Sequence, residues 1–268
     1  KIVVTENYNE KKLFGWHESA TGDLYRNFLN QFLPAIDKFL EETGYKEVTY
    51  FHVSDEPNMD FYDNYVAAKE MVSEHLKDYH IIEALSDYDF YEKGLVPSPV
   101  PATNHIKPFL ENKVPNLWTY YCSGQQKDVS NRLLAMPSWR TRCLGMQLFK
   151  YNIVGFLHWG FNFYYTAFSK RALDPFTETD SGGAFPSGDA FCVYPGPDGP
   201  WSSVRAEVFL EGLQDLRLLR LLETKMSHDE IVAMLEETKA IEFDICPESE
   251  AEFMAMRNAM INKVKELF

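Results

Sequence analysis

The sequence predicts an α/β fold of the (β/α)8 type, the TIM barrel. Apolar stretches of strand length, such as residues 48–53, alternate with segments that have helical periodicity. Strands that are apolar or aromatic along nearly their whole length are typical of a sheet buried on both faces. Their alternation with helices indicates βαβ units and a parallel sheet. With 268 residues, 45% of them hydrophobic, the chain is long and apolar enough for one barrel domain with a substantial core.

Strands are predicted where β-branched and aromatic residues gather between polar or helical segments. They fall at residues 1–5, 48–53, 80–85, 96–103, 116–121 and 153–159. Because a closed barrel requires eight strands, we expect the first two to precede Lys1. The sequence also starts without an initiator methionine or an apolar signal segment. We therefore predict that residues 1–268 form a single barrel domain that is a fragment of a longer protein.

The helices are predicted from apolar spacing and from start and stop signals. Residues 23–43 carry apolar side chains at every fourth position from Leu24 to Leu40, and Gly44 ends the helix. Further helices are predicted at residues 60–77, 88–93, 138–151, 204–224 and 248–268. A capping box at residues 227–230 starts another, so the chain ends in helices from about residue 203. Between Trp159 and these helices lies a loop of about forty residues, a length that usually carries function.

Composition excludes several classes of protein. Forty acidic and 26 basic residues give a net charge of −14, which argues against a nucleic-acid partner. No apolar run approaches the roughly 20 residues that span a bilayer. The four cysteines lack CxxC or Cys/His metal spacing and are expected to be buried thiols, which favours a reducing compartment such as the cytoplasm.

The most informative motif is HVSDEP at residues 52–57, at the end of a predicted strand. In parallel α/β folds, sites are built at the carboxyl ends of strands. Adjacent carboxylates such as Asp55 and Glu56 repel each other, so one can stay ionised while the other holds a proton. Acid-catalysed glycoside cleavage requires that division. The same letters also suit a helix start, with Ser54 or Asp55 as the cap and Pro57 in the first turn, and the two interpretations are compatible.

Aromatic residues gather on two other predicted strands. Trp118, Tyr120 and Tyr121 lie on one, and Trp159 ends the other, followed closely by Asn162. Aromatic rings in a concave pocket suit the apolar C–H faces of sugars, while polar groups fix the hydroxyls. Most of these rings are expected to fill the core instead. Trp159 is the best candidate for a sugar contact.

The predicted strand ends offer no second carboxylate. An enzymic nucleophile in a retaining glycosidase would have to lie about 5 Å from the acid. The loop acids Asp87, Asp180 and Asp189 are candidates, but only Asp55 is necessarily close to Glu56. This favours a reaction in which the substrate supplies the nucleophile.

Metal and cofactor motifs are weak or missing. His52, Asp55 and His105 are the only candidate ligands at neighbouring strand ends, and no HxH or HExxH spacing supports them. No glycine-rich phosphate loop follows a strand. We therefore expect neither a metal nor a cofactor. His158 directly precedes Trp159, so we expect the two side chains on opposite faces, with His158 in a structural role.

Five stretches in order resemble the catalytic domain of glycoside hydrolase family 123, formerly a domain of unknown function. They are FHVSDEP at 51–57, NLWTYY at 116–121, GFLHWGFNFY at 155–164, GGAFP at 182–186 and YPGPDG at 194–199. The resemblance extends over about residues 16–223. It implies a (β/α)8 barrel and an exo-acting β-N-acetylgalactosaminidase whose partner is a glycan or glycolipid. In such an enzyme the 2-acetamido oxygen of the substrate attacks the anomeric carbon, giving an oxazoline-type intermediate and retention of configuration.

The resemblance also implies roles for single residues. Glu56 would be the general acid and then the base that activates water, and Asp55 would hold the acetamido N–H and stabilise the developing positive charge. Trp159 would lie under the sugar ring, with Tyr120 or Tyr121 near the acetamido group. From their positions, the remaining glycan contacts are expected from His52, His105, Trp118, Asn162 and Asp189.

Two alternatives fit the same residues. The Asp-Glu-Pro run is similar to the Asn-Glu-Pro at the fourth strand of many barrel glycosidases that carry their own carboxylate nucleophile. Such an enzyme would also cleave sugars that lack a 2-acetamido group. A non-catalytic carbohydrate-binding barrel would instead bind N-acetylgalactosamine without turnover.

Overall fold

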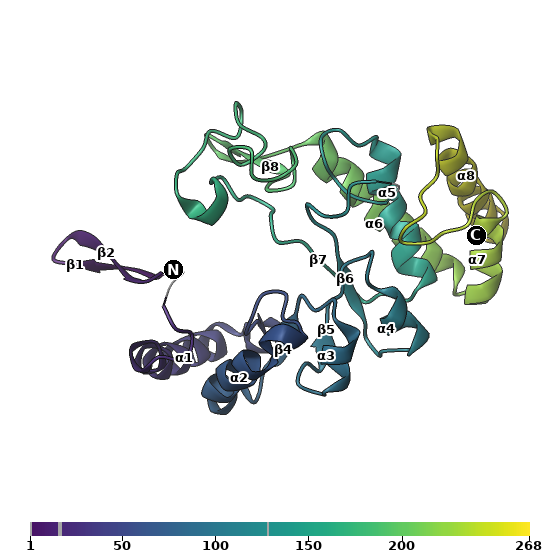
Figure 1. Ribbon diagram of the computed structural model, residues 1–268. Helices are drawn as coiled ribbons and strands as arrows, with labels where there is room; N and C mark the ends of the chain where they lie inside the picture. Colours follow the sequence, from purple (N-terminus) through teal and green to yellow (C-terminus); the bar gives the residue numbers. More distant parts are fainter. Residues whose placement is uncertain (1, 16–17, 128) are drawn as a thin grey trace. The chain divides into compact units, whose positions relative to one another are not determined.

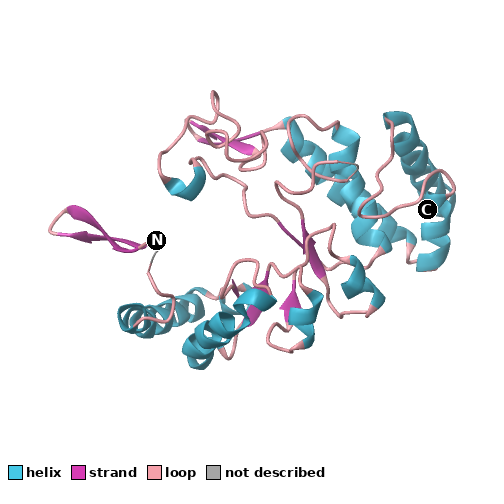
Figure 2. Cartoon of the chain, in the orientation of Figure 1, coloured by secondary structure: helices cyan, strands magenta, loops and turns pink. Residues whose placement is uncertain are grey.

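A computed structural model describes residues 2–15, 18–127 and 129–268. Over these residues the chain is a mixed α/β protein built from helices and small sheets (Figures 1 and 2). It divides into two compact units, Lys1–Val100 and Pro101–Phe268, which are described separately. In the described ranges the parallel strands form one three-stranded and one two-stranded sheet, and no closed barrel is present. None of the described helices is long and apolar enough to cross a membrane.

The first unit begins with an antiparallel hairpin. Its strands are β1 (Ile2–Glu6) and β2 (Asn9–Phe14). The strand predicted at residues 1–5 is therefore present, but it pairs with a polar segment that we expected to be a loop. The turn explains this pairing: Asn7 and Tyr8 both have positive φ, 51° and 65°, the geometry of a tight two-residue hairpin turn.

Helix α1 (Asp23–Thr43) has the predicted bounds, and Gly44 ends it with a left-handed φ of 75°. Its buried face differs from the predicted one: Leu29 and Leu33 are buried, whereas Leu24 is 77% exposed. A strict four-residue spacing drifts around a helix of 3.6 residues per turn, so its first members rotate away from its last. The buried face packs against α2 (Tyr62–Leu76).

The parallel sheet of the first unit has the strand order β3-β4-β5. Its strands are β3 (Tyr50–Phe51), β4 (His80–Glu83) and β5 (Ser98–Pro99). They are shorter than predicted. The short helix η1 (Lys46–Val48) precedes β3, η2 (Met59–Phe61) and α2 lie between β3 and β4, and α3 (Tyr88–Glu92) lies between β4 and β5. Tyr65, Leu85, Phe90 and Val96 form the core beneath the sheet end that carries the HVSDEP loop.

The second unit contains the parallel pair β6 (Trp118–Tyr120) and β7 (Gly155–Leu157). The α-helices described in this unit are α4 (Lys107–Glu111), α5 (Ser138–Lys150), α6 (Val204–Leu222), α7 (His228–Glu236) and α8 (Glu250–Leu267). Helices α5 and α6 lie side by side (Figure 1), and Gly145 of α5 approaches so closely that an added Cβ would lie 2.0 Å from the Gly212 oxygen. The predicted capping box of Ser227 and Glu230 starts α7.

The segment between β7 and α6 is more ordered than the long loop we predicted. It contains a short helix, η3 (Ala167–Ser169), and the antiparallel hairpin of β8 (Val193–Gly196) and β9 (Gly199–Ser202). Its inner part packs around Leu173, Ala190 and Phe191. This packing holds the Asp189 segment in a defined position.

Candidate active site

In the first unit, the HVSDEP residues form the loop that leaves β3. Asp55 and Glu56 are both exposed. Glu56 has a φ of 45°, a left-handed conformation that residues other than glycine adopt at a cost and that clusters at functional sites. The helix-cap interpretation fails for this loop, because Asn58 caps the following helical turn by accepting the Asp60 N–H at 3.0 Å. The loop is therefore not explained by helix initiation.

A buried carboxylate, Glu83, fixes the start of this loop. Its side chain is fully buried at the end of β4. It accepts the backbone N–H of Val53 at 2.9 Å and that of Ser54 at 3.3 Å. The hydroxyl of Tyr65 donates to it at 2.9 Å. Holding two consecutive amides orients the backbone directly before Asp55.

His52 lies between two carboxylates. Its Nδ1 is 2.8 Å from Glu83 Oε2, and its Nε2 is 3.8 Å from Asp55 Oδ1. The carboxylates of Asp55 and Glu83 raise the pKa of His52 to about 10. The nearby imidazolium of His52 in turn lowers the pKa of Asp55. At neutral pH the loop therefore carries an imidazolium beside an ionised Asp55.

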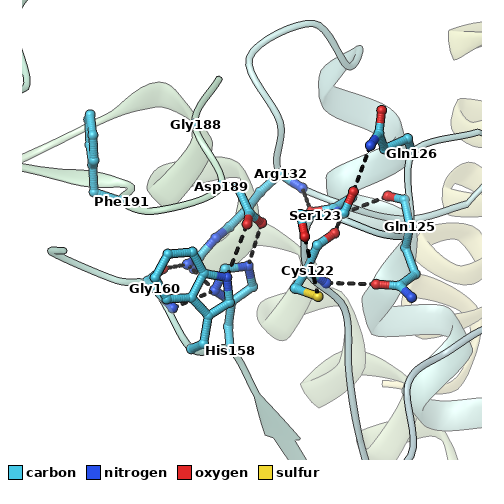
Figure 3. Close-up of polar contacts among 12 residues, drawn as sticks. Cys122, Ser123, Gln125, Gln126, Arg132, His158, Gly160, Gly188, Asp189 and Phe191 are labelled. Atoms are coloured by element: carbon cyan, nitrogen blue, oxygen red, sulfur yellow. Dashed lines mark hydrogen bonds and ion pairs between the residues drawn. The ribbon is translucent and has the colours of Figure 1, made fainter. Parts of the chain in front are cut away.

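In the second unit, Asp189 is the centre of a buried polar cluster. Figure 3 shows Arg132, His158 and Asp189 gathered beside Gly160. Asp189 is fully buried and accepts the indole N–H of Trp159 at 3.0 Å. His158 Nε2 faces the other carboxylate oxygen at 3.4 Å. Our expectation that His158 and Trp159 point to opposite faces was wrong, because β7 ends at Leu157 and strand alternation does not extend to them.

The hydrogen bonds of His158 define its tautomer. Arg132 Nη2 donates to His158 Nδ1 at 2.7 Å, and the Gly160 N–H lies 3.0 Å from the same nitrogen. Because Nδ1 accepts, the proton of the neutral ring is on Nε2, which faces Asp189. Burial lowers the pKa of His158, which keeps the ring neutral. Arg132 also donates to the Gly160 carbonyl, so one buried cation fixes both the imidazole and the adjoining backbone.

Trp159 is held as a half-exposed aromatic surface. The rings of Phe163 and Phe185 pack against its indole ring, with ring centroids 5.3 and 4.9 Å away. The residue is 43% exposed although its N–H is bound to Asp189. A fixed, exposed indole of this kind suits the apolar face of a sugar.

Arg205 of α6 fixes the segment that carries Asp189. Its guanidinium donates to the carbonyls of Gly188 at 2.7 Å, Phe191 at 2.9 Å and Arg132 at 3.1 Å. The added contact to Arg132 ties this segment to the polar cluster. Asp189 therefore has a defined backbone as well as a defined side chain.

The other candidate residues of the second unit lie in different environments. Tyr121 is fully buried against Phe156 and His158, and its hydroxyl makes no hydrogen bond within the described residues. Tyr120 is also buried. The ring of Trp118 covers Gly155 at the amino end of the strand pair, away from Trp159 at the carboxyl end.

His105 and Asn162 are both exposed. His105 lies in the turn before α4, where its N–H donates to the Ala102 carbonyl at 2.8 Å. Asn162 follows Trp159 by three residues, and its backbone forms an antiparallel bridge with Phe191. The structure thus groups Trp159 with Asp189, and His52 with Asp55, and it gives His105 and Trp118 separate places.

Two of the loop acids considered as nucleophiles bind backbone instead. Asp87 caps α3 by accepting the Phe90 N–H at 3.1 Å and also accepts the Met59 N–H at 3.1 Å. Asp180 accepts the N–H groups of the turn at residues 182–183. Within the described part of the chain, no group of three His, Cys, Asp or Glu side chains has an arrangement that could hold a metal ion.

Sequence reasoning missed Glu83, Arg132 and Arg205. Glu83 had a signal, since it is a lone carboxylate in an otherwise apolar strand and so must have buried partners. The two arginines had none, because they lie in segments whose neighbours in sequence do not indicate the carbonyls and imidazole that they bind.

Comparison with known proteins adds a family and a fold. The sequence matches the family described as "Glycoside hydrolase 123, catalytic domain" over residues 1–222. Among solved structures, the chain is similar to a family 123 glycoside hydrolase from Clostridium perfringens whose structural analysis concerned glycolipid glycan hydrolysis. The TM-score is 0.63 at 18% identity, over 99% of this chain and 48% of that one, so this chain spans about half its length. No curated protein sequence matches the chain significantly.

Proposed function

Because the chain belongs to glycoside hydrolase family 123, we propose that it is a glycosidase that removes terminal β-linked N-acetylgalactosamine from a glycan or glycolipid. We propose that residues 1–268 belong to one catalytic domain of (β/α)8 type. The observation that carries the proposal is the exposed Asp55–Glu56 pair, on a loop held by buried Glu83 and free of any helix-capping role.

The proposed reaction uses the substrate's own nucleophile. Glu56 gives its proton to the glycosidic oxygen while the acetamido oxygen attacks the anomeric carbon, so the bond to the leaving group breaks and an oxazoline-type ring forms. Asp55 accepts the acetamido N–H and stabilises the positive charge on that group. The Glu56 carboxylate then takes a proton from water, whose oxygen opens the ring with overall retention. This restores Glu56 as the acid.

The division of roles follows from the surroundings of the pair. The imidazolium of His52 lies beside Asp55 and lowers its pKa, which suits the residue that must remain an anion. In the second unit, the Trp159 surface, which the buried Asp189 holds in place, is proposed as an aromatic contact for the apolar face of a sugar. Tyr120, Tyr121, Trp118, His105 and Asn162 remain candidates for further glycan contacts.

The first experiment compares an aryl β-N-acetylgalactosaminide with the matching β-galactoside. Cleavage of the first alone supports an acetamido nucleophile. Equal cleavage of both would mean a nucleophile supplied by the protein and would overturn the proposed mechanism. Binding of N-acetylgalactosamine with no cleavage would favour a carbohydrate-binding domain.

Two variants then test the assigned residues. Glu56→Gln should abolish cleavage of substrates with poor leaving groups and retain more activity on an activated aryl glycoside, because an activated group leaves without protonation. Asp55→Asn should cost several kcal/mol of transition-state stabilisation on every substrate. Asp60→Asn, a matched exposed substitution near the loop, should leave the rate unchanged. Near-native rates for Glu56→Gln on poor leaving groups would exclude it as the acid.

A further inference from the structure

We infer that Glu83 and His52 form a buried-to-surface charged pair that positions the Asp55–Glu56 loop and keeps a cation beside Asp55. The role in catalysis rests on the proposed function, whereas the pair is a property of the first unit alone. Neither residue is proposed to touch the reacting atoms. Glu83 is a positioning residue, and His52 transmits its charge to Asp55.

Glu83 acts only as an acceptor. Four donors converge on its fully buried carboxylate: the N–H groups of Val53 and Ser54, the hydroxyl of Tyr65 and the Nδ1 of His52. A protonated acid or an amide at this position would itself carry an N–H or O–H group. That group would face one of the four donors, and the donor would lose its acceptor. The site therefore requires a carboxylate, and its negative charge is enclosed with a single cationic partner, His52.

The geometry around His52 favours protons on both of its ring nitrogens. Nδ1 faces two acceptors, Glu83 Oε2 at 2.8 Å and the Ile82 carbonyl at 3.0 Å. Nε2 faces Asp55 Oδ1 at 3.8 Å. A neutral ring would protonate Nδ1 and turn the lone pair of Nε2 toward the Asp55 carboxylate. No cation among the described contacts of His52 opposes its charge, and the raised pKa of about 10 agrees with this arrangement.

This pair gives the two adjacent carboxylates different tasks. The imidazolium keeps Asp55 ionised, which is the state that must receive the acetamido N–H. The Val53 and Ser54 amides, held by the same Glu83, fix the backbone that leads into Asp55 and Glu56. One buried carboxylate thus fixes the position of the loop and, together with Asp55, stabilises the charge of His52.

The charge is tested by NMR on the chain with 15N-labelled histidine, in which His52→Gln identifies the His52 signals among the seven histidines. In the native chain we expect His52 to remain doubly protonated at pH 8. In Glu83→Gln its pKa should fall well below the native value, because only Asp55 then stabilises the imidazolium. A neutral His52 in the native chain at pH 8, or an unchanged His52 pKa in folded Glu83→Gln, would overturn the inference.

Activity provides the second readout. Glu83→Gln should lower kcat/KM about tenfold or more at pH 7. Its kcat/KM should also decline at the lowered His52 pKa that the NMR titration gives, whereas the native profile should show no step at that pH. Tyr65→Phe removes one of the four donors but keeps the charge, so it should leave His52 protonated and cost less than Glu83→Gln. Asp37→Asn removes a carboxylate that binds the Tyr79 hydroxyl elsewhere in the same unit and should leave the pH profile unchanged.

The outcomes separate this inference from the proposed function. If the native chain cleaves neither substrate, the proposed function fails, and the NMR titration still decides whether the pair exists. If Glu83→Gln does not fold, as judged by circular dichroism, the half-exposed His52→Gln takes its place, and an unchanged kcat/KM and pH profile in that variant would overturn the positioning role.

Discussion

Asp189→Asn tests whether the buried polar cluster of the second unit is stabilising. The substitution keeps the shape of the side chain but replaces one carboxylate oxygen with an NH2 group. The native carboxylate accepts the Trp159 indole N–H at 3.0 Å and faces His158 Nε2 at 3.4 Å. An asparagine can accept from one of these donors and must turn its own N–H2 toward the other.

The magnitude follows from these contacts. Losing a charge-assisted hydrogen bond costs about 1.5–3 kcal/mol, and leaving a buried donor unpaired adds a cost of about 1–3 kcal/mol. The two costs overlap in part. We therefore expect Asp189→Asn to lower the free energy of unfolding by about 3 kcal/mol.

Urea unfolding, followed by circular dichroism and tryptophan fluorescence, measures this loss. Asp174→Asn is the matched control, because Asp174 is exposed on the same segment and its single acceptor contact, to the Phe176 N–H at 3.0 Å, is one that asparagine retains. It should change stability by less than about 0.5 kcal/mol. A loss below about 1 kcal/mol in Asp189→Asn would refute the reasoning that the carboxylate anchors Trp159.

Three further predictions concern packing, capping and pH. Gly145→Ala should destabilise the chain by about 3 kcal/mol, since its Cβ would lie 2.0 Å from the Gly212 oxygen, whereas Gly124→Ala, with no atom within 4 Å, should be near neutral in the same urea titration. Ser227→Ala should cost about 1 kcal/mol by removing the capping box of α7, and an unchanged melting temperature would contradict this. His52 has a folded pKa of about 10, above its ordinary 6.5, so its stabilisation is complete below pH 6.5 and is lost as the pH rises through 10. The urea midpoint should fall over that range in the native chain, and His52→Gln should show a smaller fall.

Local sequence signals predicted most helices well because their causes are local. The first helix has the predicted bounds, set by its apolar periodicity and by Gly44, and the capping box starts α7 as predicted. The strand predictions were less accurate. The segment at residues 48–53 forms only the two-residue strand Tyr50–Phe51, because strand length depends on which partner backbone runs alongside. The hairpin at the start was missed since its second strand is polar.

The sequence predicted part of the candidate site, including Asp189, which the structure buries. Asp55, Glu56 and Trp159 were identified because each belongs to a motif that is contiguous in sequence, and the resemblance of these motifs to family 123 is confirmed by the family match over residues 1–222. Glu83 and Arg132 were not identified as site residues. The partners described for their side chains lie 18 to 31 positions away in the sequence.

The sequence by itself thus determined the family, the alternation of elements and the exposed chemical groups, because these depend on residue type and on spacing along the chain. Only the tertiary structure decided the charge and orientation of those groups. A carboxylate such as Glu83 or Asp189 acquires its role from the donors that folding brings around it. Burial removes the competing water, so that these few contacts control which neighbour is protonated and which is held in place.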